Sequence, residues 1–155
     1  MNRFASAIFC DDIRFEVGNK FTLAGVYSAD MFFEELPGFI PKFGVSMRFD
    51  TPMDKPVKAI RFKVYKGDEV LADIDVPVVV PDAAEQSPTV RLDGHDVPTR
   101  RQYNFNVLLP PIMITAPCTL RATVLADDVE YVAGKLRIGP IRNGVAPTEA
   151  EATAR

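Results

Sequence analysis

The charged residues best suited to chemistry lie close together near the N-terminus, in the segment AIFCDDIRFEVGNKFTLAGVYS (residues 7–28). Two adjacent carboxylates are followed there by a basic and an acidic residue: Asp11, Asp12, Arg14 and Glu16. Carboxylates beside a guanidinium group could transfer protons, hold a cation or bind a charged partner. These four residues are the first binding candidates, and none of them is assigned as catalytic.

The same segment has the pattern of a β-hairpin. Two strand-like runs flank Gly18 and Asn19, which tolerate the positive φ of a tight turn. Side chains alternate between the faces of a strand, which gives one face Phe9, Asp11, Ile13 and Phe15 and the other Cys10, Asp12, Arg14 and Glu16. The two acids are therefore expected on opposite faces, which disfavours an enzyme that uses Asp11, Asp12 and Arg14 together.

Asp11 is the unusual member of its face, because a regular strand would direct it toward the core. A buried carboxylate must be paired, hydrogen-bonded or protonated. A β-bulge near Cys10 could instead return it to water, or it could be a structural acid that accepts backbone N–H groups. These structural interpretations are favoured over a catalytic, metal-binding or partner-binding role.

Two weaker candidates involve aspartates in predicted loops. His95, the one histidine, lies between Asp93 and Asp96 and could join a metal site, although an exposed loop histidine is the favoured interpretation. Asp50 and Asp54, with Asp82, Asp93 and Asp96, could supply oxygen ligands to calcium at one end of a sandwich, in the manner of C2 domains. This calcium hypothesis is weak, and no metal site is assigned.

Other chemistries lack their motifs. The sequence contains no phosphate-binding loop, nucleophile elbow, H-E-x-x-H or C-x-x-C pattern, so no cofactor is expected. Arg100 and Arg101 precede Tyr103 and Phe105, an arrangement that can stack single-stranded nucleic acid. The two aromatic residues share the apolar alternation with Val107, however, so core packing is favoured over nucleic-acid binding.

Composition sets outer limits on the function. The chain has 155 residues, 47% of them hydrophobic, and a formal net charge of −3. This charge provides no basic surface for nucleic acid, and no stretch is apolar for the ~18 residues of a membrane span. A cytoplasmic location is expected, with Cys10 and Cys118 unbridged.

The hydrophobic pattern along the chain has period two, as in FGVSMRFD (residues 43–50) and KAIRFKVYK (residues 58–66). It predicts about nine strands in an all-β fold, an antiparallel β-sandwich of immunoglobulin-like or C2-like type. Ala29–Leu36 is the best candidate for a short helix. Residues 1–143 are expected to form one domain, followed by a flexible tail over residues 144–155.

The N-terminal pattern resembles a family of uncharacterised bacterial proteins, a domain of unknown function. The matching residues are Cys10, Asp11, Asp12, Arg14, Glu16, Gly18, Lys20, Leu23, Gly25, Val26 and Tyr27, followed by Leu36 and Pro37. The resemblance covers roughly the first forty residues. It implies a small bacterial β-sandwich and supplies no activity or ligand.

An apolar surplus outside the alternating strands points to packing or binding. The segments over residues 29–43 and 107–114 are rich in large apolar side chains around prolines. They are expected mainly to cover the ends of the sandwich, and partly to form a patch for another chain. A non-enzymatic interaction or structural module, binding itself or another protein, is thus the leading hypothesis. A ligand- or calcium-binding module and an enzyme remain the alternatives.

Overall fold

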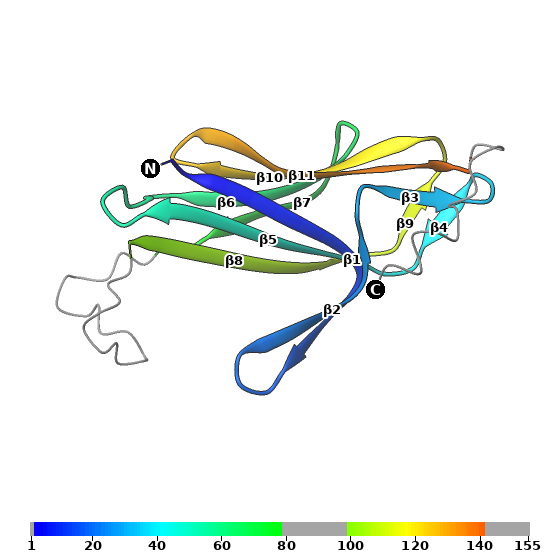
Figure 1. Cartoon of the computed structure of the whole chain (residues 1–155). Helices are drawn as coiled ribbons and strands as arrows, with labels where there is room; N and C mark the ends of the chain where they lie inside the picture. The colour runs from blue at the N-terminus through cyan, green and yellow to red at the C-terminus, as the bar shows by residue number, and fades with distance from the viewer. Residues whose placement is uncertain (1, 79–98, 142–155) are drawn as a thin grey trace, which may run out of the picture.

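The computed structural model describes residues 2–78 and 99–141, and these residues form an all-β structure (Figure 1). The strands, in chain order, are β1 (Phe4–Glu16), β2 (Lys20–Tyr27), β3 (Asp30–Phe33), β4 (Gly38–Ile40), β5 (Phe43–Pro52), β6 (Ile60–Lys66), β7 (Glu69–Val76), β8 (Arg100–Leu109), β9 (Ile112–Ile114), β10 (Cys118–Ala126) and β11 (Val129–Pro140). The all-β prediction is confirmed, and the described residues alone contain eleven strands where the pattern of the whole sequence suggested about nine.

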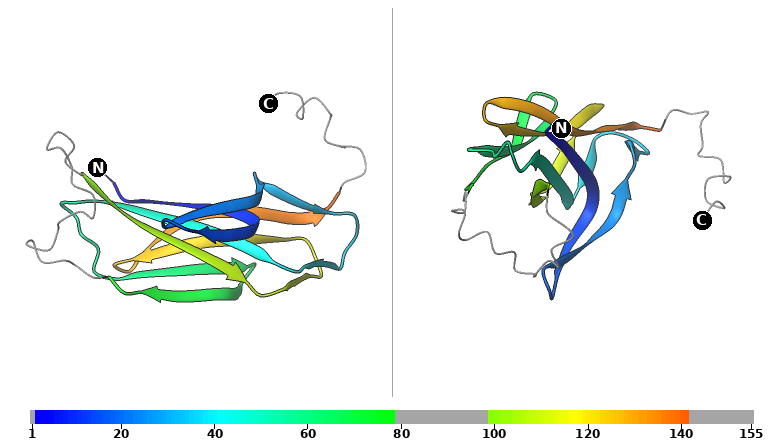
Figure 2. Two further views of the ribbon diagram at one scale, coloured as in Figure 1. Left: turned by 90° about the horizontal axis from the view of Figure 1, so that it is seen from below. Right: turned by 60° about the vertical axis from the view of Figure 1, so that its left-hand side comes forward.

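Two sheets pack against each other as a sandwich (Figures 1 and 2). Sheet A has the order β2-β1-β5-β8, and sheet B has the order β3-β11-β10-β6-β7. A small sheet C consists of β4 and β9. The pairs are antiparallel except for β3 beside β11. The predicted antiparallel β-sandwich is therefore confirmed.

Alternation along the central strands builds the core, as the sequence predicts. The inward positions of β5 and β6 are buried: Phe43, Val45, Met47 and Phe49, and Ile60, Phe62 and Val64. The rings of Phe62 and Phe105, one from each sheet, stack with centroids 5.0 Å apart. Period-two burial on facing strands excludes water from the space between the sheets.

The short helix predicted at Ala29–Leu36 is wrong. The segment forms β3 and a following bend, and β3 pairs in parallel with the end of β11. Met31 is buried there while its neighbour Phe32 is exposed, which is the alternation of a strand. Pairing with a distant strand has overridden the local composition.

The two apolar segments contribute to the core as the sequence suggested, and part of their apolar surface remains exposed. Ile40, Ile112 and Ile114 of sheet C are buried against the core cluster. Phe32 and Phe39 point outward and are 64% and 55% exposed. These segments thus close one end of the sandwich and leave aromatic surface beside it.

The predicted turn between β1 and β2 is confirmed by the positive φ of Gly18 and Asn19. Asp127 and Asp128 also have positive φ, between β10 and β11. β7 is an edge strand and ends at Val76, immediately before a proline that cannot donate to a ladder. The calcium candidate Asp82, the segment around His95, Asp93 and Asp96, and the tail over 144–155 lie outside the described residues.

Within residues 2–78 and 99–141, no helix has the length and apolarity needed to cross a membrane. Cys10 is buried and Cys118 is half-buried, and both are free thiols. Burial raises the pKa of both thiols, so they remain protonated and pack as small apolar groups.

The stacked pair between the sheets predicts the effect of a core truncation. Phe62→Ala removes a fully buried ring and should lower the free energy of unfolding by about 3–5 kcal/mol. Val132→Ala, at a half-exposed position of β11, should change it by less than about 0.5 kcal/mol. Urea denaturation followed by circular dichroism measures both, and equal effects would contradict the proposed core.

Candidate functional site: a projecting arm and an adjoining pocket

Strand β1 changes its partners along its length. Its first half pairs with β5, from Phe4 opposite Asp50 to Cys10 opposite Gly44. Its second half pairs only with β2, ending at Glu16 opposite Lys20. Residues 12–24 therefore project from the sandwich as a two-stranded ribbon, here called the arm (Figures 1 and 2).

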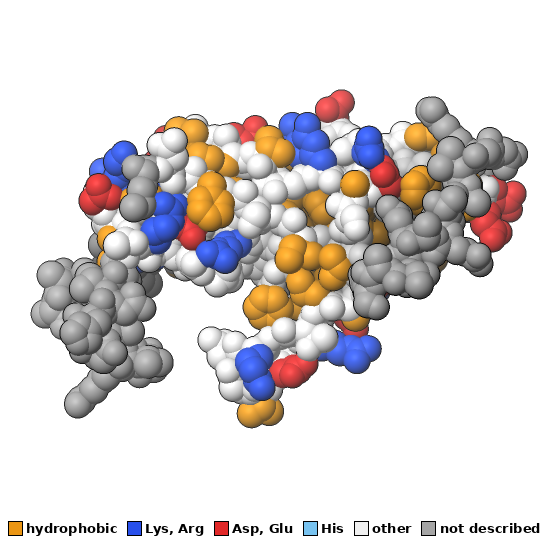
Figure 3. Space-filling model, in the orientation of Figure 1, with side chains coloured by type: hydrophobic (Ala, Val, Ile, Leu, Met, Phe, Trp, Pro, Cys, Tyr) orange, Lys and Arg blue, Asp and Glu red, His pale blue; other side chains and the backbone are white. Residues whose placement is uncertain are grey.

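The arm has one apolar and one polar face. Cross-strand pairing places Phe15 opposite Phe21 and Ile13 opposite Leu23 on the same face. Phe15 is 69% exposed and Phe21 is 43% exposed, whereas Ile13 at the root is buried. Apolar side chains are visible where the arm leaves the body and at its tip (Figure 3). The distal half of this apolar face is uncovered in the single chain.

The root of the arm is fixed by packing on Gly44. An added Cβ at Gly44 would lie 2.7 Å from Ile13 Cγ1 and 2.8 Å from Cys10 Sγ, so only glycine leaves space for both. Cys10 and Ile13 have opposite alternation in β1, yet both meet the same residue of β5. The ribbon consequently twists sharply between them, at Asp11 and Asp12.

Asp11 lies at this twist. It is exposed, and neither the burial expected of a regular strand nor the alternative of a β-bulge is found. The ladder runs from Cys10 opposite Val26 to Asp12 opposite Ala24, so no residue is inserted and the bulge is absent. Asp11 keeps the alternation of Phe9 but lies beyond the point where β5 stops pairing, and it is exposed. Its carboxylate accepts a hydrogen bond from the Tyr27 hydroxyl. Burial and this bond to Asp11 raise the pKa of Tyr27, so the phenol keeps its proton.

The other three candidate residues have different partners. Asp12 forms an ion pair with Lys42, and Arg14 Nε lies 3.5 Å from Asp12 Oδ2. Glu16 accepts a hydrogen bond from the Thr22 hydroxyl across the ribbon. The structure thus joins Asp12 with Arg14 and leaves Asp11 and Glu16 with separate partners.

A pocket of about 280 Å³ lies beside Asp11. Asp11 and Tyr27 form one side of it, and residues 31–33 and 39–42 form the rest. The site therefore combines residues of β1 and β2 next to the arm with strand β3, strand β4 and the loop after β4. Pattern analysis singled out Asp11 but missed the pocket, because residues from several separate segments form it.

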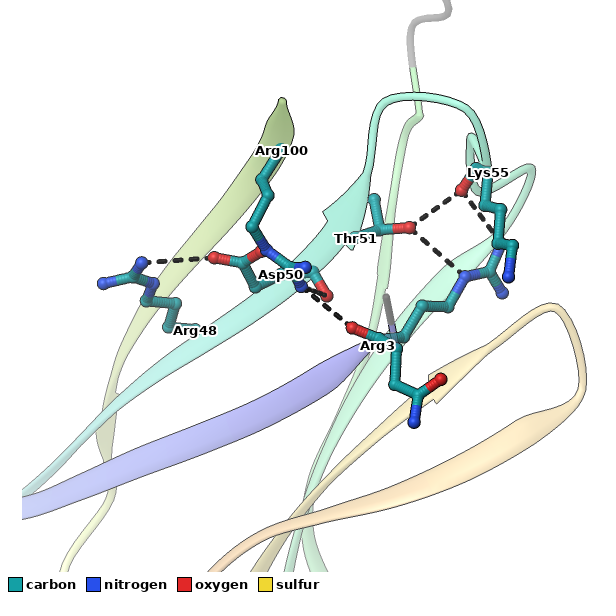
Figure 4. A network of polar contacts seen from close by, with 7 residues as sticks. Arg3, Arg48, Asp50, Thr51, Lys55 and Arg100 are labelled. Atoms are coloured by element: carbon teal, nitrogen blue, oxygen red, sulfur yellow. Dashed lines mark hydrogen bonds and ion pairs between the residues drawn. The ribbon is translucent and has the colours of Figure 1, made fainter. Parts of the chain in front are cut away.

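The calcium hypothesis expected Asp50 in a loop, but the structure places it within strand β5. Asp50 is only 1% exposed, and its carboxylate forms ion pairs with Arg100 and with Arg48, the latter at 3.2 Å. Figure 4 shows Arg48 and Arg100 reaching Asp50 from different strands. Two guanidinium groups occupy the oxygens that a cation would need, so this acid is structural.

The other loop aspartates give no support for a metal site. Asp54 is exposed in the loop between β5 and β6. In the part of the chain that the structure describes, no three His, Cys, Asp or Glu side chains are grouped so that they could hold a metal ion.

Arg100, the first residue of the basic pair, makes its contacts within the fold. Arg100 joins Asp50, donates to the backbone oxygen of Asn2 at 3.0 Å and lies over the Phe4 ring. Tyr103 and Phe105 pack against the core cluster, which confirms the core interpretation.

No family model matches the chain, and no curated protein matches it either. The resemblance of the first forty residues to a bacterial family stays a prediction.

The twist at Asp11 predicts an unusual sensitivity of Gly25. Gly25 has φ +65°, and an added Cβ would lie 1.9 Å from Asp11 Oδ2. Gly25→Ala should therefore reduce stability by more than the about 1–2 kcal/mol that positive φ alone costs an alanine. Denaturant unfolding measures the difference.

A matched glycine separates the two effects. Gly67 has φ +57° with no atom near an added Cβ. Gly67→Ala should therefore lower the free energy of unfolding only by the cost of positive φ. Asp11→Ala removes the two atoms nearest the added Cβ and leaves Cβ at 3.0 Å, so Gly25→Ala should cost less in the Asp11→Ala background than in the wild type. If Gly25→Ala costs no more than Gly67→Ala, the contact with Asp11 is wrong.

The ion pair at the arm root predicts a titration shift. The Lys42 ammonium beside Asp12 holds the pKa of that carboxyl below its usual value. Folding stability from this pair is therefore present above the unfolded-state pKa and is lost as the pH falls through the folded-state pKa. Lys42→Met should raise the pKa of Asp12, as followed by carboxyl ¹³C NMR. Lys55→Met should leave it unchanged, and a shift in both variants would exclude Lys42 as the cause.

Proposed function

We propose that this protein is a non-enzymatic interaction module that binds a second copy of itself through the arm. The uncovered aromatic pair of Phe15 and Phe21 is the observation that carries the proposal. Phenylalanines are normally buried, and an isolated two-stranded ribbon is marginally stable in water. A partner that covers the apolar face would stabilise both the ribbon and the complex.

The free edge of β2 supports the choice of a second copy. β2 is the terminal strand of sheet A and pairs with β1 alone among the described strands. An edge strand offers unpaired backbone N–H and C=O groups along its outer side. Two copies related by a two-fold axis can pair their β2 strands antiparallel, which joins two A sheets through a closed, self-complementary interface.

The charges of the arm are compatible with such pairing. Its polar face carries Asp12, Arg14 and Glu16 on β1 and Lys20 on β2. Because the signs alternate, a second arm in antiparallel orientation can set acids opposite bases. The guanidinium of Arg14 is exposed and lies 3.5 Å from Asp12, which leaves it accessible to a charged group of a second arm.

The carboxylates of the N-terminal segment support a binding role over an enzymatic one. Asp11 is held by Tyr27, and Asp12 by Lys42 and Arg14, so the two acids act in different local networks. We further propose a cytoplasmic protein of the bacterial family that the N-terminal pattern resembles. The free thiols of Cys10 and Cys118 are compatible with a reducing compartment.

Sedimentation equilibrium over about 10–500 µM tests the proposal, since weak protein pairs dissociate in this range. The wild-type chain should show a reversible monomer–dimer equilibrium. Phe15→Ser with Phe21→Ser should weaken dimerisation at least about tenfold, because it removes the apolar face at the centre of the interface.

A matched pair of exposed apolar residues provides the control. Val129 and Val132 of β11 are half-exposed and lie far from the arm, in sheet B. Val129→Ser with Val132→Ser should leave the dimerisation constant unchanged. A wild-type chain that stays monomeric throughout the range, or equal weakening in both double variants, would refute self-association through the arm.

A further inference from the structure

We infer that the pocket beside Asp11 is a binding site for a small organic cation, an ammonium group attached to one ring or a short apolar chain. This inference is independent of the self-association proposed above. It follows from the charge balance of the pocket, from the aromatic surface around it and from its size.

The pocket carries one negative charge that no basic side chain neutralises. Lys42, the one cation of its lining, forms an ion pair with Asp12. Asp11 receives instead a hydrogen bond from the neutral Tyr27 hydroxyl, the only side-chain partner found for it within the described residues. The phenol orients the carboxylate without cancelling its charge, so an incoming cation gains an attraction that an anion or neutral molecule does not.

The remaining lining supplies an apolar wall with exposed rings. Phe32 and Phe39 are more than half exposed although both border the pocket, and the buried Met31 and Ile40 also contribute to the lining. The face of an aromatic ring attracts ammonium groups, and exposed rings beside a carboxylate are a recurring means of binding organic cations. Their exposure here also leaves apolar surface that a ligand body can cover.

The volume restricts the ligand to a small one. About 280 Å³ lies at the lower limit of ligand pockets, which span about 300–1,000 Å³. A single ring with a two-carbon amine has a suitable size. For so few atoms the dissociation constant is expected on the order of 1–10 mM.

Titration of the ¹⁵N-labelled full chain with three matched probes tests the inference by NMR. 2-Phenylethylamine, 2-phenylethanol and 3-phenylpropionate share the ring and chain but differ in charge. The amine should perturb the amides of Asp11, Tyr27, Phe32 and Phe39 and bind about three- to tenfold more tightly than the alcohol. The propionate should bind most weakly.

Variants identify the source of the preference. Asp11→Asn keeps an acceptor for the Tyr27 hydroxyl and removes the charge, so amine and alcohol should then bind equally. Asp68→Asn, at an exposed turn between β6 and β7, removes the same charge elsewhere and should leave the preference intact. Phe39→Ala should weaken amine and alcohol together, because it removes apolar contact.

The outcomes separate this site from the arm. The double variant Phe15→Ser with Phe21→Ser should bind the amine with the affinity of the wild type. A chain that does not self-associate would therefore still be expected to bind the cation. Equal affinity for the three probes, a preference that survives Asp11→Asn, or perturbations centred away from these residues would each overturn the inference.

Discussion

The arrangement at the arm end of the protein depends on one strand having two successive partners. β1 belongs to the sandwich while it pairs with β5, as far as Cys10, and to the arm from Asp12 onward. A strand that extends beyond one of its two neighbours must either end there or continue paired with the other neighbour alone. β1 continues with β2, and this single change places Asp11 in the lining of a pocket and leaves the phenylalanine pair exposed.

Two glycines make the change of partner sterically possible. Gly25 adopts a left-handed conformation opposite Asp11, and the Asp11 side chain fills the space that a Cβ would need. Gly44 accepts Cys10 Sγ and Ile13 against its backbone. The first permits the twist of the ribbon and the second anchors it, so the direction of the arm is fixed by close packing and not by a flexible linker.

Local alternation predicted most strands because each depends on the residue types of a short segment. It also assigned Asp11 correctly to the face of Phe9. It could not reveal the exposure of Asp11, because that depends on where the neighbouring strand stops. Asp50 shows the converse: an acid expected in a loop is buried, because Arg100, fifty residues away, meets it on an adjacent strand. The helix expected at Ala29–Leu36 failed for the same reason, since β11 supplies its pairing.

The energetics of the arm constrain how such a module can act. A fully buried phenylalanine contributes about 1.5–3 kcal/mol, and Phe15 and Phe21 are already partly covered. Association costs about 4–15 kcal/mol in lost freedom, so these rings alone give a weak complex even when both copies contribute them. Backbone bonds along β2 must add to the rings, and they form only in one register. The complex needs both burial of the rings and backbone pairing along β2 in one register. A second copy of the arm can meet both requirements at once, whereas an unrelated apolar surface meets only the first.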